Sequence, residues 1–91
     1  MPEVRCDITF RGSVQGVGFR YTTVRIAEKH RVTGWVRNEP DGSVRCVVEG
    51  RREEIDRFIT AVEDAMAGSI RDKALDQRPA TGEFEGFEIR R

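Results

Sequence analysis

Residues 12–20 read Gly12-Ser13-Val14-Gln15-Gly16-Val17-Gly18-Phe19-Arg20. The run before them, Val4 to Arg11, alternates apolar and polar side chains, as a half-buried strand does. A helix-like segment begins after them, at Tyr21. A strand, a glycine-rich loop and a helix N-terminus in this order can cradle an anion, because glycine permits positive φ and successive backbone N–H groups then turn toward one point.

Arg20 and the expected helix together favour phosphate as that anion. The helix N-terminus adds partial positive charge, and the planar guanidinium suits phosphate oxygens. The loop lacks the Gly-Lys-Ser/Thr ending of nucleotide-binding loops, and it carries no cysteine that could act as a nucleophile. From the loop alone, a tight strand-to-helix turn with a surface arginine explains the same residues equally well.

A second segment, residues 32–44, predicts a strand, a turn at Pro40-Asp41-Gly42 and the start of another strand. Asn38 lies at the end of the first of these strands. Asparagine near a turn often bonds the local backbone, so this position alone predicts a turn residue as readily as a functional one.

Two amphipathic helices are expected. The first runs from Tyr21 to about His30. Its inward-facing residues are expected to include Tyr21, Val24 and Ala27. The second follows Arg51, and its apolar residues repeat at helical spacing: Ile55, Phe58, Ile59, Val62 and Met66.

The order of elements is strand, helix, strand, strand, helix, strand, with a short final strand near Phe87 and Ile89. This order is the ferredoxin-like βαββαβ pattern. We expect an α+β sandwich in a single domain, residues 1–91, whose mostly antiparallel sheet carries two helices on one face. The strand near Ile70–Arg78 shows no clear alternation, and Asp72 stands where an apolar residue is expected, so its register and length stay open.

The composition excludes several classes of protein. Sixteen basic residues balance sixteen acidic ones, so no global field attracts nucleic acid or an anionic membrane. No long apolar run or signal-peptide pattern occurs, which predicts a cytoplasmic protein. Cys6 and Cys46 fall on the inward faces of their strands, and a reducing cytoplasm disfavours a disulfide between them. Two cysteines and one histidine are too few for a closed zinc site, so no metal is expected.

Several segments of the chain resemble the acylphosphatase family. They are residues 12–20 as quoted, Gly34-Trp35-Val36-Arg37-Asn38, Asp41-Gly42-Ser43-Val44 and Gly86-Phe87-Glu88-Ile89-Arg90. The resemblance spans nearly the whole chain. It implies hydrolysis of acyl phosphates, the mixed anhydrides of a carboxylic acid and phosphate, to a carboxylate and inorganic phosphate, without a metal or any other cofactor.

The resemblance also implies which residues form the site. Arg20 and Asn38 would be catalytic, and the phosphate-binding loop would comprise Val14, Gln15, Gly16, Val17, Gly18 and Phe19. In this interpretation the loop N–H groups and Arg20 neutralise the phosphate, and Asn38 positions a water in line with the phosphorus. The expected partners of the monomer are an acyl phosphate and inorganic phosphate, with no nucleic acid and no membrane.

A non-catalytic anion- or RNA-binding module of ferredoxin-like fold is the alternative. RNA-recognition domains of this architecture stack bases on exposed aromatic side chains of the two central strands. Here the corresponding positions on the open face carry no aromatic residue: Arg5, Asp7, Thr9, Ser43, Arg45 and Val47. Trp35, on a neighbouring strand, is the one large aromatic residue expected to reach that face. The composition of this face therefore favours the enzyme.

Overall fold

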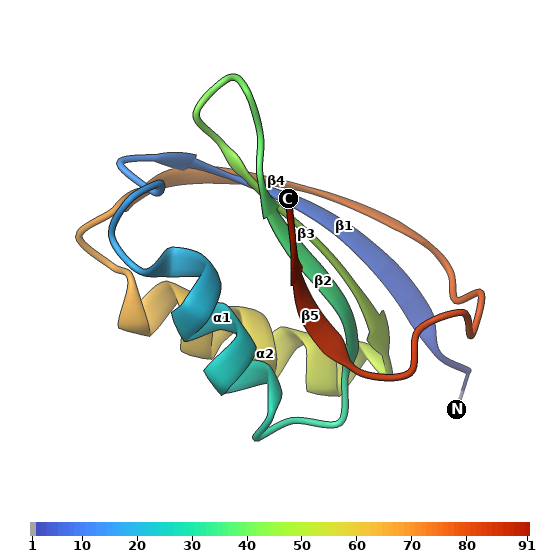
Figure 1. The fold of residues 1–91 in the computed structure, drawn as a ribbon. Coiled ribbons are helices and arrows are strands. Elements are labelled where there is room, and N and C mark those ends of the chain that lie inside the picture. The colour runs from blue at the N-terminus through green and yellow to red at the C-terminus, as the bar shows by residue number, and fades with distance from the viewer. Residues whose placement is uncertain (1) are drawn as a thin grey trace.

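The computed structural model describes residues 2–91, so Met1 of the expected 1–91 domain lies outside the described residues. The elements in chain order are β1 Val4–Gly12, α1 Phe19–Ala27, β2 Thr33–Asn38, β3 Val44–Gly50, α2 Arg52–Ala65, β4 Ile70–Pro79 and β5 Phe87–Arg90. The five strands form one sheet in the order β4-β1-β3-β2-β5. Both helices pack on the same face of this sheet (Figure 1). The expected ferredoxin-like α+β sandwich is therefore confirmed.

The sheet is mostly antiparallel, as predicted. β1 pairs antiparallel with β3 and with β4, and β2 pairs antiparallel with β3. β5 instead runs parallel to β2, with Gly34 opposite Phe87 and Arg37 opposite Arg90. The final strand therefore lies at the sheet edge beside β2 and ends where β2 ends.

The core lies between the sheet and the two helices. Alternate residues of β1 and β3 are fully buried within it: Cys6, Ile8, Phe10, Val44, Cys46 and Val48. The buried residues of α2 are Ile55, Phe58, Ile59 and Val62, which confirms the helical spacing read from the sequence. Cys6 and Cys46 are free thiols in this core, in agreement with the alternation of their strands.

The first helix begins earlier than predicted, and its expected inward residues Ala27 and Val24 are buried or packed against the core while Tyr21 is not. Gly18, with a φ of 75°, forms the N-cap, so α1 starts at Phe19, and it ends at Ala27. Phe19 is 2% exposed, and its ring centroid lies 5.2 Å from that of Phe10. The prediction that Tyr21 points inward is wrong: anchoring Phe19 in the core turns Tyr21 outward, where it is 61% exposed. The buried residues of α1 are Phe19, Thr23 and Ala27.

The sequence left the register of β4 open, and the structure determines it. It pairs with β1 from Val4 opposite Pro79 to Arg11 opposite Asp72. Most of its side chains are exposed because β4 is an edge strand of the sheet. Asp72 therefore lies at an exposed edge and not in the core, which explains why the segment shows no alternation.

A buried carboxylate fastens the connection between β4 and β5 to the sheet. Glu49 of β3 is 2% exposed. It accepts hydrogen bonds from Arg5 Nε at 2.7 Å and from the backbone N–H groups of Thr81 and Gly82, each at 2.9 Å. Burial alone would raise the pKa of Glu49, but these hydrogen bonds outweigh burial and lower the pKa to about 2. The ionised carboxylate of Glu49 thus holds the start of the β4–β5 connection against the sheet. This connection leads to β5, which lies beside β2.

Candidate active site

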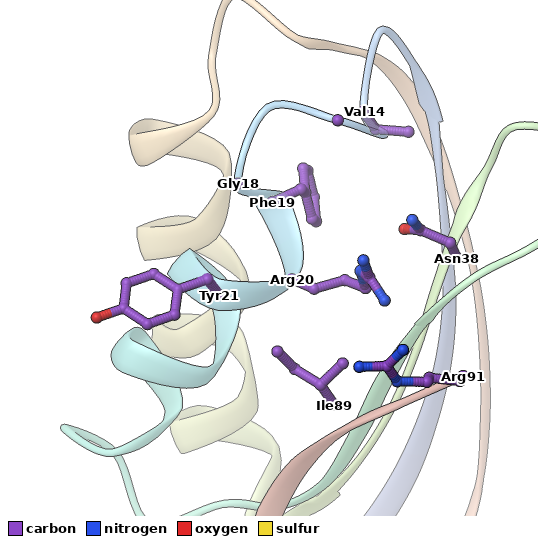
Figure 2. Close-up of a pocket in the computed structure, with 9 residues that line it drawn as sticks. Val14, Gly18, Phe19, Arg20, Tyr21, Asn38, Ile89 and Arg91 are labelled. Atoms are coloured by element: carbon purple, nitrogen blue, oxygen red, sulfur yellow. The ribbon is translucent and has the colours of Figure 1, made fainter.

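A cavity of about 230 Å³ lies between the β1–α1 loop, the end of β2 and the end of β5 (Figure 2). Its lining residues are Val14, Gly16, Gly18, Phe19, Arg20, Tyr21, Asn38, Ile89 and Arg91. Within residues 2–91, no acidic side chain is among them. The fold therefore brings Arg20 and Asn38, which sequence analysis predicted as catalytic, to one cavity.

The backbone of the loop has the glycine conformations that an anion cradle requires. Gly16 and Gly18 have φ values of 78° and 75°. A Cβ at either position would meet no neighbouring atom, so the backbone conformation, and not space, favours glycine there. No side chain of residues 2–91 caps the first turn of α1, and that turn carries no acidic residue. Its free N–H groups and the positive end of its dipole are thus available beside the cavity.

Arg20 extends from the first turn of α1 into the cavity, with its guanidinium directed toward the end of β2 (Figure 2). Most other arginines pair with a carboxylate. Arg20 has no such partner in the described part of the chain. Its charge and its planar set of donors are therefore free to bind an anion.

Asn38 ends β2 with its side chain directed toward the same cavity (Figure 2). Its Oδ1 atom is buried and has no hydrogen-bond partner within residues 2–91. An unpaired buried acceptor costs about 1–3 kcal/mol, so a donor from solvent or ligand is expected at this atom.

The turn that follows Asn38 closes without the Asn38 side chain. The Glu39 N–H donates to the Ser43 carbonyl at 2.9 Å. The Asp41 carboxylate accepts from the Ser43 N–H at 2.9 Å and from the Ser43 hydroxyl at 2.6 Å. These hydrogen bonds from Ser43 lower the pKa of Asp41 and keep it ionised in this role. The local contacts therefore give no support to the interpretation of Asn38 as a turn residue.

Gln15 and Val17 of the predicted loop are not among the lining residues. The Gln15 side chain turns to the β2–β3 hairpin, where Nε2 donates to the carbonyls of Glu39 at 2.8 Å and Ser43 at 2.9 Å. Val17 is 49% exposed. Gln15 thus fixes the loop to the hairpin that carries Asn38, while Val14, Gly16, Gly18 and Phe19 line the cavity itself.

A family model described as Acylphosphatase matches residues 6–89. The chain belongs to the acylphosphatase family. An acylphosphatase of Salinibacter ruber is 44% identical over 98% of this chain and 95% of its own length. The crystal structure of acylphosphatase from Bacillus subtilis matches with a TM-score of 0.89 and 31% identity, covering 97% of this chain and 99% of the other. Membership of the acylphosphatase family makes the protein an enzyme that hydrolyses acyl phosphates, as predicted.

The acylphosphatase fold also occurs within a larger protein. The crystal structure of HypF from T. kodakarensis matches with a TM-score of 0.81 and 33% identity. The match covers 94% of this chain but 12% of HypF. By contrast, this chain has nearly the full length of the Salinibacter and Bacillus acylphosphatases.

Three residues that line the cavity were not predicted from the sequence: Tyr21, Ile89 and Arg91. Tyr21 lies on α1 with its hydroxyl directed away from the cavity (Figure 2). Ile89 belongs to β5, and Arg91 follows it. Because the parallel pairing ends at Arg37 and Arg90, Asn38 and Arg91 are the next residues along their two neighbouring segments. The sequence offered one signal for Ile89 and Arg91, the alternation of the final strand. That alternation does not reveal which other strand the final strand pairs with.

The positive groups of the cavity are Arg20, Arg91 and the N-terminal end of α1. Within residues 2–91, no three His, Cys, Asp or Glu side chains are grouped so that they could hold a metal ion. The arrangement can therefore bind an anion through arginine and backbone N–H donors.

Proposed function

We propose that the phosphoryl group of the acyl phosphate binds against the β1–α1 loop and Arg20, and that Asn38 positions the attacking water. The water oxygen bonds to phosphorus as the bond between phosphorus and the acyl oxygen breaks. The carboxylate leaves with the electron pair of that bond, and it needs no general acid because it is a weak base. One water proton moves to a phosphoryl oxygen and the other stays on the attacking oxygen, which gives inorganic phosphate.

The loop and Arg20 stabilise the charge of the phosphoryl group. The positive φ of Gly16 and Gly18 lets backbone N–H groups converge, and the start of α1 adds its dipole. The guanidinium of Arg20 can donate to two phosphoryl oxygens at once. Such preorganised donors lower the barrier when they bind the transferring group more tightly in the transition state than in the ground state.

The observation that carries this proposal is the unpaired Oδ1 of Asn38. Within residues 2–91 the atom is buried, has no donor and belongs to a side chain that lines the cavity. A water whose O–H donates to Oδ1 satisfies it and keeps a lone pair free to attack phosphorus. Holding the water and the phosphoryl group in this relation converts a bimolecular encounter into an oriented reaction.

The proposal uses no metal and no cofactor, and its partners are the acyl phosphate and inorganic phosphate. We keep a monomer built as one domain as part of the proposal. The two free thiols are of the kind that a reducing cytoplasm maintains. Neither helix of residues 2–91 has the length and apolar character needed to cross a bilayer.

The open face of the sheet supports the enzyme over an RNA-binding module. Trp35 reaches this face, but it is only 7% exposed. The guanidinium groups of Arg37, Arg45 and Arg90 lie 4.8, 5.5 and 5.1 Å from the centre of its ring. A base needs an uncovered ring on which to stack, and these arginines already occupy that position.

Substitution of Asn38 tests the proposal directly. In Asn38→Ala we expect kcat to fall about a hundredfold or more, because the water loses its acceptor. The inhibition constant of inorganic phosphate and the Tm should change little, since the loop and the turn retain their contacts. Ser43→Ala is the matched control in the same hairpin: it removes a turn hydrogen bond, so its Tm should fall while kcat stays near that of the wild type. A destabilised Asn38→Ala with normal kcat would remove Asn38 from the mechanism.

A further inference from the structure

Two guanidinium groups face the cavity, and the proposed hydrolysis uses one of them. Arg91 and Arg20 point toward the same space from the end of β5 and from α1 (Figure 2). Neither has a carboxylate partner in the part of the chain that the structure describes. The neighbouring Arg90, by contrast, pairs with Glu88 and lies over the ring of Trp35. The orientation of Arg91 is therefore not explained by an ion pair within the fold.

Like charges that face one cavity repel each other, and no acidic side chain of residues 2–91 lines this cavity to compensate. The repulsion is relieved when negative groups occupy the space between the charges. One of these groups is the phosphoryl group. A second guanidinium can meet the same phosphoryl group or a second negative group on the same ligand, and the arrangement of the cavity distinguishes the two.

The arrangement of the cavity assigns the two charges to different parts of the substrate. Val14 and Gly18 lie on one side of Arg20, and Ile89 and Arg91 lie on the other (Figure 2). When a phosphoryl group lies in the loop, the part of the cavity left for the acyl chain extends toward Ile89 and Arg91. The cavity of about 230 Å³ has the volume of roughly eight waters at about 30 Å³ each, so it can hold more than the five heavy atoms of a phosphate.

We propose that Arg91 binds a second carboxylate at the far end of the acyl chain, so that the preferred substrates are monophosphate anhydrides of dicarboxylic acids. The guanidinium matches a carboxylate with two parallel N–H donors, and Ile89 offers an apolar contact to the methylene groups between the two ends. The inference rests on the proposed function, because it takes the phosphoryl group to lie in the loop.

Succinyl phosphate and butyryl phosphate form the pair of substrates that tests this. Both have four-carbon acyl chains. Succinyl phosphate ends in a carboxylate, and butyryl phosphate ends in a methyl group. We expect the ratio of kcat/KM for succinyl over butyryl phosphate to fall about five- to tenfold in Arg91→Ala, mainly through the KM of succinyl phosphate. Arg91→Lys should keep part of the preference, and Arg91→Glu should lower the ratio further. The ratio of the wild type should also shrink at high salt, which screens an exposed pair of charges.

Arg78→Ala is the control for net charge, since Arg78 is exposed on β4, at the opposite edge of the sheet from β5. Its ratio should equal that of the wild type. An unchanged ratio in Arg91→Ala overturns the inference, including the case in which both substrates lose activity equally and Arg91 binds the phosphoryl group. A different variant, Arg20→Ala, tests the proposed function itself. If the proposed function is wrong, Arg20→Ala hydrolyses both substrates at the wild-type rate, whatever the ratio of kcat/KM between them.

Discussion

The side-chain amide of Gln15 donates to the backbone carbonyl of Glu39 at 2.8 Å, which ties the β1–α1 loop to the residue that follows Asn38. A second hydrogen bond, to the Ser43 carbonyl at 2.9 Å, reaches the other strand of the same hairpin. One side chain outside the cavity thus joins the β1–α1 loop to the hairpin that carries the residue we propose to hold the water.

Gln15→Ala should lower kcat by about tenfold, because a small misplacement of the reacting groups reduces their alignment. The fold should persist, since the core does not include this residue. Gln77→Ala, at an exposed position of β4, is the matched control and should keep full turnover. Steady-state kinetics on both variants test this prediction. If Gln15→Ala has the same kcat as Gln77→Ala, the loop keeps its position without Gln15.

Arg20→Ala should reduce kcat/KM by a hundredfold or more, which corresponds to a loss of about 3 kcal/mol of transition-state stabilisation. Arg20→Lys should recover little, because an ammonium group cannot reproduce the two parallel donors. Arg25→Ala on the same helix is the control, since this arginine is exposed and contacts Tyr21 and Glu28. If either Arg20 variant works within a few-fold of the wild type, Arg20 has no part in the mechanism.

Removal of divalent metal ions should leave turnover unchanged, because the proposed mechanism relies on arginine and backbone donors alone. The assay compares initial rates on butyryl phosphate before and after treatment with a chelator. The same rates are then measured with added magnesium or zinc. Activity that disappears with the chelator and returns with a divalent ion would contradict the prediction.

Gly34→Ala should lower the free energy of unfolding by about 3 kcal/mol or more. Gly34 has a φ of 147°, and an added Cβ would lie 1.9 Å from the carbonyl oxygen of Val47. Gly68→Ala is the control, because a Cβ there meets no atom within 4 Å. Denaturant unfolding of the two variants gives the comparison. Similar midpoints for both would mean that β2 and β3 can separate locally without loss of stability.

The stability of the protein should fall as the pH drops from about 4.5 to about 2, in part through Glu49. The folded state lowers the pKa of this carboxyl from 4.5 to about 2, so its contribution is complete above pH 4.5 and is lost as protons bind below it. The contribution at neutral pH is on the order of 3 kcal/mol. Glu49→Gln should therefore have a lower Tm than the wild type at pH 7 and a smaller difference at pH 3. A Tm difference that stays constant between these pH values would contradict the assignment.

The sequence predicted those parts of the fold that depend on regular patterns. The alternation from Val4 to Arg11 and the helical spacing from Ile55 to Met66 are both present as buried faces. The strand near Ile70–Arg78 could not be placed, because an edge strand carries exposed side chains and leaves no apolar pattern. Of the residues predicted on the inward face of α1, Tyr21 was wrong, because the helix starts at Phe19 after the N-cap Gly18.

For the site, too, the sequence predicted some residues and missed others. Arg20, Asn38 and the glycines of the loop lie in the segments that resemble the acylphosphatase family, so the sequence pointed to them. Arg91 could not be found by the same means, because its place depends on the parallel pairing of β5 with β2. Such a pairing joins segments distant in sequence, and a short strand at the end of a chain does not reveal its neighbour.

The position of β5 at the sheet edge has a consequence for how the enzyme matures during synthesis. A ribosome that has translated the chain through α2 has already synthesised the β1–α1 loop and Asn38, but not the segment that holds Ile89 and Arg91. The cavity then lacks one wall, and β2 lacks its parallel neighbour. We therefore expect interrupted translation products to contain the β1–α1 loop without a complete cavity, so that each molecule completes the lining of its cavity only when its last strand docks.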